Sequence, residues 1–92
     1  MAKGNKQRVN EWFLSGTLKK VTRIFGGAYL DVNNTIEVKD GDKLMHHRVW
    51  IGEMMWDEHV DELQPGIELC VTGEVYYGND GVYNKAKALQ II

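Results

Sequence analysis

The chain has 92 residues, a formal net charge of −2 at pH 7 and 43% hydrophobic residues. This length predicts one domain, and the single cysteine, Cys70, excludes an intrachain disulfide and fits a reducing compartment. No apolar run approaches the roughly 20 residues that a membrane-spanning helix needs, and the basic start of the chain lacks the apolar stretch of a signal peptide. We therefore expect a cytoplasmic protein.

Residues 1–9 are predicted to form a mobile basic arm, and residues 10–92 a single domain. The segment from 11 to 21 alternates between two faces and predicts a first strand. Gly16 lies where a long barrel strand needs to bend sharply. The inward face of this strand carries Trp12, Leu14 and Leu18, and the outward face carries Phe13, Ser15, Thr17 and Lys19.

A second strand is predicted over residues 28–33, and residues 36–38 extend it after an irregularity at Asn33-Asn34. Asp40-Gly41 marks a hairpin, because this pair of residues tolerates positive φ, and a third strand follows over residues 44–51. Successive side chains of a strand point to opposite faces. The expected outward rows are Tyr29, Asp31 and Asn33 on the second strand and His46, Arg48 and Trp50 on the third, with the intervening residues pointing inward.

A short helix is predicted after the third strand, because Trp56, Val60 and Leu63 recur with the spacing of one helix face. Asp57-Glu58 is placed at its start, where acidic side chains suit the helix dipole. Pro65-Gly66 is expected to end it.

A fourth strand is predicted from residue 67 to residue 75 and a fifth from 82 to 91, separated by a turn at 78–81. The element order β-β-β-α-β-β is typical of an all-β class, the five-stranded Greek-key barrel called the OB-fold, with one short helix between strands three and four. An SH3-like barrel would explain the strands but would not need a helix at that place.

Four phrases, in chain order, resemble bacterial single-stranded-DNA-binding proteins, which have this fold. They are the opening strand Val9-Asn10-Glu11-Trp12-Phe13-Leu14-Ser15-Gly16-Thr17-Leu18, the entry Gly26-Gly27-Ala28 to the second strand, His47-Arg48-Val49 on the third, and the fourth strand from Gly66 to Gly73. The resemblance implies sequence-tolerant binding of single-stranded DNA in replication or recombination, by a homodimer or homotetramer, with no cofactor and no enzymatic activity.

Three departures from the family favour a small, tailless relative, similar to the primosomal replication protein N or to a phage- or plasmid-borne single-stranded-DNA-binding protein. The family's long tail with an acidic tip, a hook for replication and repair proteins, is missing. The loop between the fourth and fifth strands is short, and its aromatic residues are Tyr76, Tyr77 and Tyr83. His46 stands where the family has Trp.

Single strands are held by aromatic faces that stack on bases and by cations that follow the phosphates. The binding face of this barrel centres on the second and third strands. Arg48 suits either purpose, since a guanidinium binds phosphate or stacks. The expected stacking residues are Phe13, Tyr29, His46, Trp50, Tyr76 and Tyr83, and the expected phosphate contacts are Lys19, Lys20, Arg23, Lys85 and Lys87.

Some of these assignments have a structural alternative. Trp50 either stacks on bases or is buried under a loop or in a subunit interface, and Tyr76 and Tyr83 are either binding residues or plain cross-strand partners. Trp12 and Trp56 lie on inward rows and are expected in the core. The first strand is expected to pair with both the fourth and the last, which would make the basic residues of the first and fifth strands neighbours.

The charge distribution keeps a second class of function open. Residues 49–84 are rich in Asp and Glu and contain no Lys or Arg, which suits an OB-fold protein–protein adaptor or an oligomeric structural module. Single-stranded RNA is also open as a ligand, because stacking and phosphate contacts do not read the sugar. No metal site is expected, because the adjacent His46 and His47 point to opposite faces of a strand, and no catalytic set of residues is visible.

Overall fold

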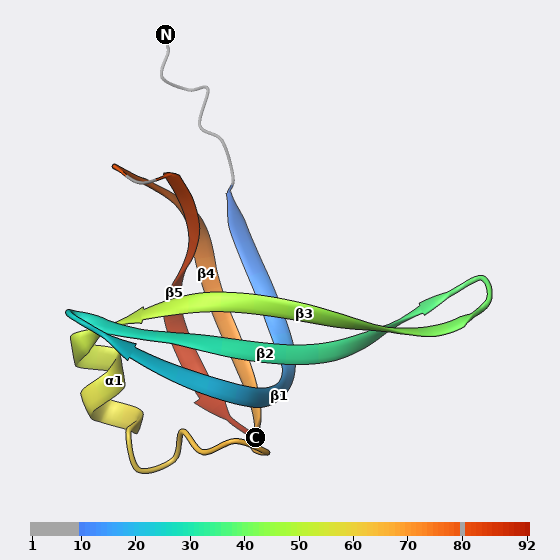
Figure 1. The fold of residues 1–92 in the computed structure, drawn as a ribbon, viewed down its shortest axis with the longest axis horizontal. Coiled ribbons are helices and arrows are strands. Elements are labelled where there is room, and N and C mark those ends of the chain that lie inside the picture. The colour runs from blue at the N-terminus through green and yellow to red at the C-terminus, as the bar shows by residue number, and fades with distance from the viewer. Residues whose placement is uncertain (1–9, 80) are drawn as a thin grey trace, which may run out of the picture.

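Five strands and one helix make up the protein in this computed structural model, which describes residues 10–79 and 81–92 (Figure 1). The elements are β1 (Glu11–Ile24), β2 (Gly27–Val38), β3 (Gly41–Gly52), α1 (Glu53–His59), β4 (Glu68–Gly78) and β5 (Gly81–Ile91). The strands close into a barrel in the order β1-β2-β3-β5-β4. The predicted OB-fold, with its helix between β3 and β4, is confirmed, while the predicted mobile arm lies outside the described residues.

Strand β1 pairs with two different strands of the barrel. Its first half pairs with β4 from Glu11 to Thr17, and its second half pairs with β2 from Thr17 to Ile24. The register with β2 shifts between Leu18 and Lys20, and such an irregularity bends a strand. A Cβ at Gly16 would collide with the backbone oxygen of Asn33, so the absence of a side chain lets the two strands approach each other here.

The partner of β5 differs from the sequence-based expectation. β5 pairs antiparallel with β4 along its length and meets β3 in parallel at Trp50 and Lys85, while β1 pairs with β2 and β4. The expectation that the first strand also pairs with the last was therefore wrong. Because β4 occupies the free edge of β1, the barrel closes through β3 and β5 instead.

The core lies inside the barrel and takes most of its residues from the predicted inward rows, with Ala86 added from β5. Each large, fully buried aliphatic side chain stabilises the fold by roughly 1.5–3 kcal/mol. The buried hydrophobic residues are Leu18, Ala28, Leu30, Val32, Val49, Ile51, Leu63, Leu69, Val71 and Ala86. Trp12 and Trp56 are partly buried and pack against this core, as predicted.

The helix is shorter than predicted and begins earlier. It starts directly after β3 and ends at His59, so Pro65 does not terminate it and Asp57-Glu58 lies in its second half. The carbonyl of His59 accepts hydrogen bonds from the backbone N–H groups of Glu62 and Leu63, at 2.9 and 3.1 Å. This turn, rather than the helix, brings Leu63 into the core.

Strands β2 and β3 form a long hairpin that extends beyond the barrel (Figure 1). Their pairing is continuous from Gly27–Gly52 to Val38–Gly41, so the predicted irregularity at Asn33-Asn34 was wrong for this strand pair. Gly41 has φ 118° and closes the hairpin, as the Asp-Gly signal predicted. In the described part of the chain, no helix is long and apolar enough to cross a membrane.

Candidate nucleic-acid interface

Three cross-strand pairs form a line on the outer face of β2 and β3. Tyr29 is opposite Trp50, Asp31 opposite Arg48, and Asn33 opposite His46. None of the six side chains is buried, whereas the intervening Val49 and Ile51 are in the core. The predicted outward rows are therefore confirmed. The register of the two strands also shows which side chains of the two rows are direct neighbours.

Tyr29, Trp50, Tyr76 and Tyr83 form an aromatic cluster at one end of this line. The Trp50 and Tyr83 rings meet edge-on, with centroids 5.8 Å apart, and the Tyr76 and Tyr83 centroids lie 5.3 Å apart. The ammonium of Lys85 lies 4.7 Å from the Tyr76 ring centroid and 6.0 Å from that of Trp50, within reach of a cation–π interaction. Desolvation raises the pKa of the Tyr83 hydroxyl, and Tyr76 and Tyr29 add to the effect.

The Trp50 indole lies next to two glycines. A Cβ at Gly27 would be 3.1 Å from Trp50 Cζ2, and a Cβ at Gly52 would be 3.5 Å from Cη2. The indole therefore lies close to the bare backbone of this cross-strand glycine pair, on the outside of the barrel. Trp50 is half-buried, so it is not a core residue of this chain.

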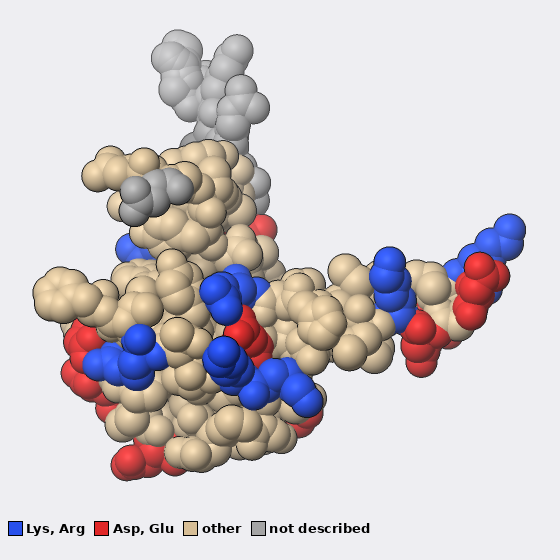
Figure 2. All heavy atoms as spheres, in the orientation of Figure 1, with Lys and Arg blue, Asp and Glu red and all other residues tan. Residues whose placement is uncertain are grey.

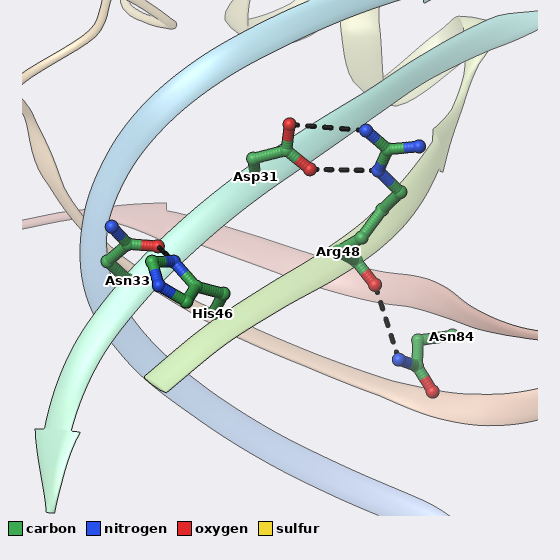
Figure 3. A network of polar contacts seen from close by, with 5 residues as sticks. All are labelled: Asp31, Asn33, His46, Arg48 and Asn84. Carbon is green, nitrogen blue, oxygen red and sulfur yellow. Dashed lines mark hydrogen bonds and ion pairs between the residues drawn. The ribbon is translucent and has the colours of Figure 1, made fainter. Parts of the chain in front are cut away.

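Arg48 and Asp31 form a bidentate ion pair, the middle one of the three cross-strand pairs (Figure 3). Arg48 donates from Nε to Asp31 Oδ1 at 2.8 Å and from Nη2 to Oδ2 at 3.3 Å. The hydrogen bond from Arg48 holds the pKa of the Asp31 carboxyl below its usual value, and the same contact raises the pKa of Arg48. The guanidinium carbon lies 5.3 Å from the Tyr29 ring centroid.

The two adjacent histidines contact different residues. His46 Nδ1 lies 2.9 Å from Asn33 Oδ1 on the outer face. The Asn34 amide donates to the Ser15 carbonyl at 2.9 Å, so its oxygen is the atom that accepts from His47 Nε2–H at 3.2 Å. Among residues 10–79 and 81–92, no group of three His, Cys, Asp or Glu side chains is placed to hold a metal ion.

The outer face of β2 and β3 is hollowed on both sides of Arg48. One hollow of about 420 Å³ is lined by Lys19, Lys20, Asp31, His46 and Arg48, together with Asn33 and His47. The other, of about 330 Å³, is lined by Tyr29, Arg48, Trp50, Val82, Tyr83 and Asn84. Arg48 borders both hollows, which together are called the groove.

The predicted phosphate contacts fall into two groups. Lys19 and Lys20 line the groove, and within the described residues neither forms an ion pair. Arg23 instead binds Glu53 at 3.1 Å and the Gly27 carbonyl at 2.7 Å, beside α1. Its guanidinium carbon lies 4.7 Å from the Trp56 ring centroid.

Phe13 and Lys87 lie together on another side of the barrel. They line a separate hollow of about 430 Å³ along β1 and β4, where Lys87 Nζ is 3.6 Å from a Glu11 carboxylate oxygen. Phe13 is exposed there. The pairing of β1 with β5, from which proximity of their basic residues was expected, does not occur, because β4 lies between these strands.

Two groove residues escaped the sequence analysis. Asp31 was placed on the outward row but not recognised as the partner of Arg48, and Asn84 donates from Nδ2 to the Arg48 carbonyl at 3.2 Å (Figure 3). The signal for Asp31 was the hairpin register, which places it opposite Arg48 once the turn is fixed at Gly41. No local pattern marks Asn84, because its contact depends on the barrel closure.

Charge is unevenly distributed over the surface. Figure 2 shows Lys and Arg side chains gathered over the middle of the face that β2 and β3 cross, with an acidic side chain between them, and a second basic group near α1. Acidic side chains are prominent at the end of the barrel that carries α1. The groove is thus more basic than the net charge of −2 suggests.

No protein-family model matches the sequence, and neither does any curated protein. Solved structures do match the fold. The mitochondrial single-stranded DNA binding protein Rim1 from S. cerevisiae has a TM-score of 0.74 at 10% identity, over 94% of this chain and 96% of that one. Plasmodium falciparum SSB in complex with single-stranded DNA has a TM-score of 0.68 at 15% identity, over 100% of this chain and 99% of that one.

A chain of the S. pombe Stn1–Ten1 complex has a TM-score of 0.66 at 16% identity. The match covers 91% of the present chain but 59% of the S. pombe chain. At these low identities the three likenesses establish the OB-fold.

Proposed function

We propose that this protein binds single-stranded DNA along the groove, with little dependence on base sequence, and acts in replication or recombination. The observation that carries the proposal is the groove itself, which has an aromatic cluster at one end and, at the other, Lys19 and Lys20, neither of which forms an ion pair among the described residues. Both components of single-strand recognition are therefore present on the same face of the barrel.

The residues of the groove have distinct roles in this proposal. Tyr29 and Trp50 are half-buried and supply the exposed part of their rings for stacking, while Tyr83 of β5 packs against the Trp50 ring. Lys19 and Lys20 contact phosphates, and Lys85 places a cation beside the aromatic cluster. Tyr76 and His46 lie at the margins, where Tyr76 packs on Tyr83 and His46 on Asn33.

The comparisons support this proposal through the proteins that share the fold. Rim1 is a single-stranded DNA binding protein by name, and the Plasmodium falciparum SSB structure contains single-stranded DNA. OB-folds bind oligonucleotides through the face that carries the second and third strands. The groove of the present chain lies on that face. We accordingly assign it binding and no enzymatic role.

A titration with fluorescently labelled oligo-dT at low salt tests the proposal. We expect anisotropy to rise and tryptophan fluorescence to be quenched, because Trp50 lies in the groove. A blunt duplex of the same length is the control for charge alone, and oligo-rU tests whether the sugar is read. The proposal fails if oligo-dT produces no change at tens of micromolar protein, or if the duplex binds equally well.

We further propose that the protein acts as a homodimer or homotetramer. A single groove lined by Lys19 and Lys20 supports only modest affinity, and several barrels linked on one strand bind more tightly without new contacts in each groove. The chain also exposes apolar side chains outside the groove, among them Phe13 on β1 and Ile36 and Leu44 on the β2–β3 hairpin. Light scattering of the free protein measures the assembly, and a monomer with nanomolar affinity would contradict this argument.

An adaptor function is the second candidate, and the surface at α1 favours it. Phe25 and Met54 are strongly exposed. Phe25 lies two residues before Gly27, Met54 lies two residues after Gly52, and these two glycines are paired across β2 and β3. The helix α1 itself carries acidic residues, including Glu53 and Asp57. A basic, apolar segment of a replication protein suits such a surface. Capture of such a partner that is abolished by Met54→Glu and unaffected by oligo-dT would support this function.

A further inference from the structure

The Arg48–Asp31 pair leaves part of the guanidinium free. A guanidinium has five N–H groups, and Asp31 accepts from Nε and Nη2. The end of the group, formed by Nη1 and Nη2, therefore keeps a parallel pair of N–H donors. Figure 3 shows the remaining nitrogen directed away from Asp31. The Arg48 side chain is 57% exposed, so a ligand in the groove can reach these donors.

Asp31 also fixes the direction of those donors. Two hydrogen bonds to one carboxylate hold the guanidinium plane, and Asn84 ties the Arg48 backbone to β5. The guanidinium carbon is within 5.3 Å of the Tyr29 ring centroid. A pre-organised guanidinium loses less conformational entropy when it binds than a free side chain would.

The local charge favours a base over a phosphate as the ligand of this fork. Asp31 neutralises Arg48 and lies within reach of Lys20, which also lowers the pKa of the Asp31 carboxyl. A phosphate at the fork would be repelled by the Asp31 carboxylate, whereas a base edge carries no net charge. Among bases, guanine presents two adjacent acceptors, O6 and N7, which match the parallel N–H pair of an Arg.

We infer that Arg48, held by Asp31, is a specificity-determining residue that reads the O6/N7 edge of a guanine at the centre of the groove. The inference rests on the proposed binding of single-stranded DNA and adds one base preference to it. Adenine offers N7 but places an amino group beside it, and thymine and cytosine lack N7. The groove therefore tolerates any base by stacking, and guanine alone gains the two hydrogen bonds.

Anisotropy titrations of labelled oligo-dT with one central nucleotide replaced test this inference. Replacement by dG should tighten binding about tenfold relative to dT, dA or dC at the same position. Deoxyinosine keeps O6 and N7 and should bind like dG, while 7-deaza-dG lacks N7 and should fall back toward dT. If 7-deaza-dG binds as tightly as dG, stacking accounts for the preference and the inference is overturned.

Two variants separate this inference from the proposed function. Arg48→Lys keeps the charge but removes the fork, so the ratio of the affinity for the dG-containing oligonucleotide to that for oligo-dT should fall to about one, whatever happens to the absolute affinities. Asp31→Asn should lower the same ratio of affinities, because the fork is no longer held in place, and Asp42→Asn, an exposed acid on β3 outside the groove, is the matched charge control that should leave the ratio unchanged. Equal binding of all four oligonucleotides refutes the guanine contact alone, whereas no binding of any of them refutes the proposed function as well.

Discussion

Trp50 of β3 meets Tyr83 of β5 edge-on, with ring centroids 5.8 Å apart and an angle of 77° between the rings. The contact spans the junction at which the barrel closes, since Trp50 is also the residue through which β3 pairs with β5. The contact between the two inclined rings limits the rotation of the indole, and part of the indole surface stays exposed. The closure of the fold and the orientation of the proposed stacking surface therefore depend on the same pair of strands.

Trp50→Ala should reduce affinity for oligo-dT by about 1–3 kcal/mol, the range of one base–aromatic stack. The fold should remain intact, because Trp50 is half-buried on the outer face. Trp56→Ala is the matched control, since Trp56 packs against the core and its loss should lower the melting temperature instead. Paired melting and binding curves distinguish these outcomes. A Trp50→Ala protein that has a lowered melting temperature but binds oligo-dT normally once folded would contradict the stacking role.

Gly73→Ala should destabilise the barrel by about 1–3 kcal/mol, through overpacking. A Cβ at Gly73 would collide with the Lys85 carbonyl and with the Trp12 ring. Gly52→Ala is the control, because its Cβ would meet Trp50 at an ordinary 3.5 Å and its φ is −79°. Chemical denaturation of the two variants gives the comparison. Equal stabilities would show that β4 can shift away from Trp12 without loss.

The periodicity of the sequence predicted the barrel because alternation has a direct physical cause. Burial of the inward residues drives folding, and on β2 and β3 these include Leu30, Val32, Val49 and Ile51. Because successive side chains of a strand alternate, the spacing of these residues fixes which neighbours point outward. The position of Trp50 on the outer face follows from the same rule. Element type and face could therefore be predicted from the chain alone.

The groove itself depends on relations that no local pattern contains. Lys85 reaches the aromatic cluster because β5 pairs with β3, and Arg23 is removed from the groove by an ion pair with Glu53, 30 positions away. Asp31 neutralises Arg48 only because the hairpin register places them opposite each other. The residue types showed which side chains are cationic. Which of these cations lie at the groove depends on ion pairs and strand pairs between residues far apart in the sequence.

The Asp31–Arg48 pair predicts a pH dependence with a defined sign. Arg48 lowers the folded-state pKa of Asp31 below its unfolded value of about 3.9, so the pair stabilises the protein above that pH. This contribution is lost as the pH falls through the lowered folded-state pKa. The difference in melting temperature between the parent and Asp31→Asn should therefore be small but present at pH 7 and vanish in strong acid. A difference independent of pH would exclude this origin.

The salt dependence of binding should report the cations that the structure leaves unpaired. On a single strand, the log–log slope of affinity against salt changes by about 0.7 for each phosphate contact. Lys19→Ala and Lys20→Ala should each flatten the slope by about that amount, because both residues line the groove without an ion pair among the described residues. Lys87→Ala removes the same charge from a pair with Glu11 and should change the slope less. Affinities measured with oligo-dT at several salt concentrations give all three slopes. A larger effect at Lys87 than at Lys19 and Lys20 would move the phosphate path to the hollow between β1 and β4, away from the groove.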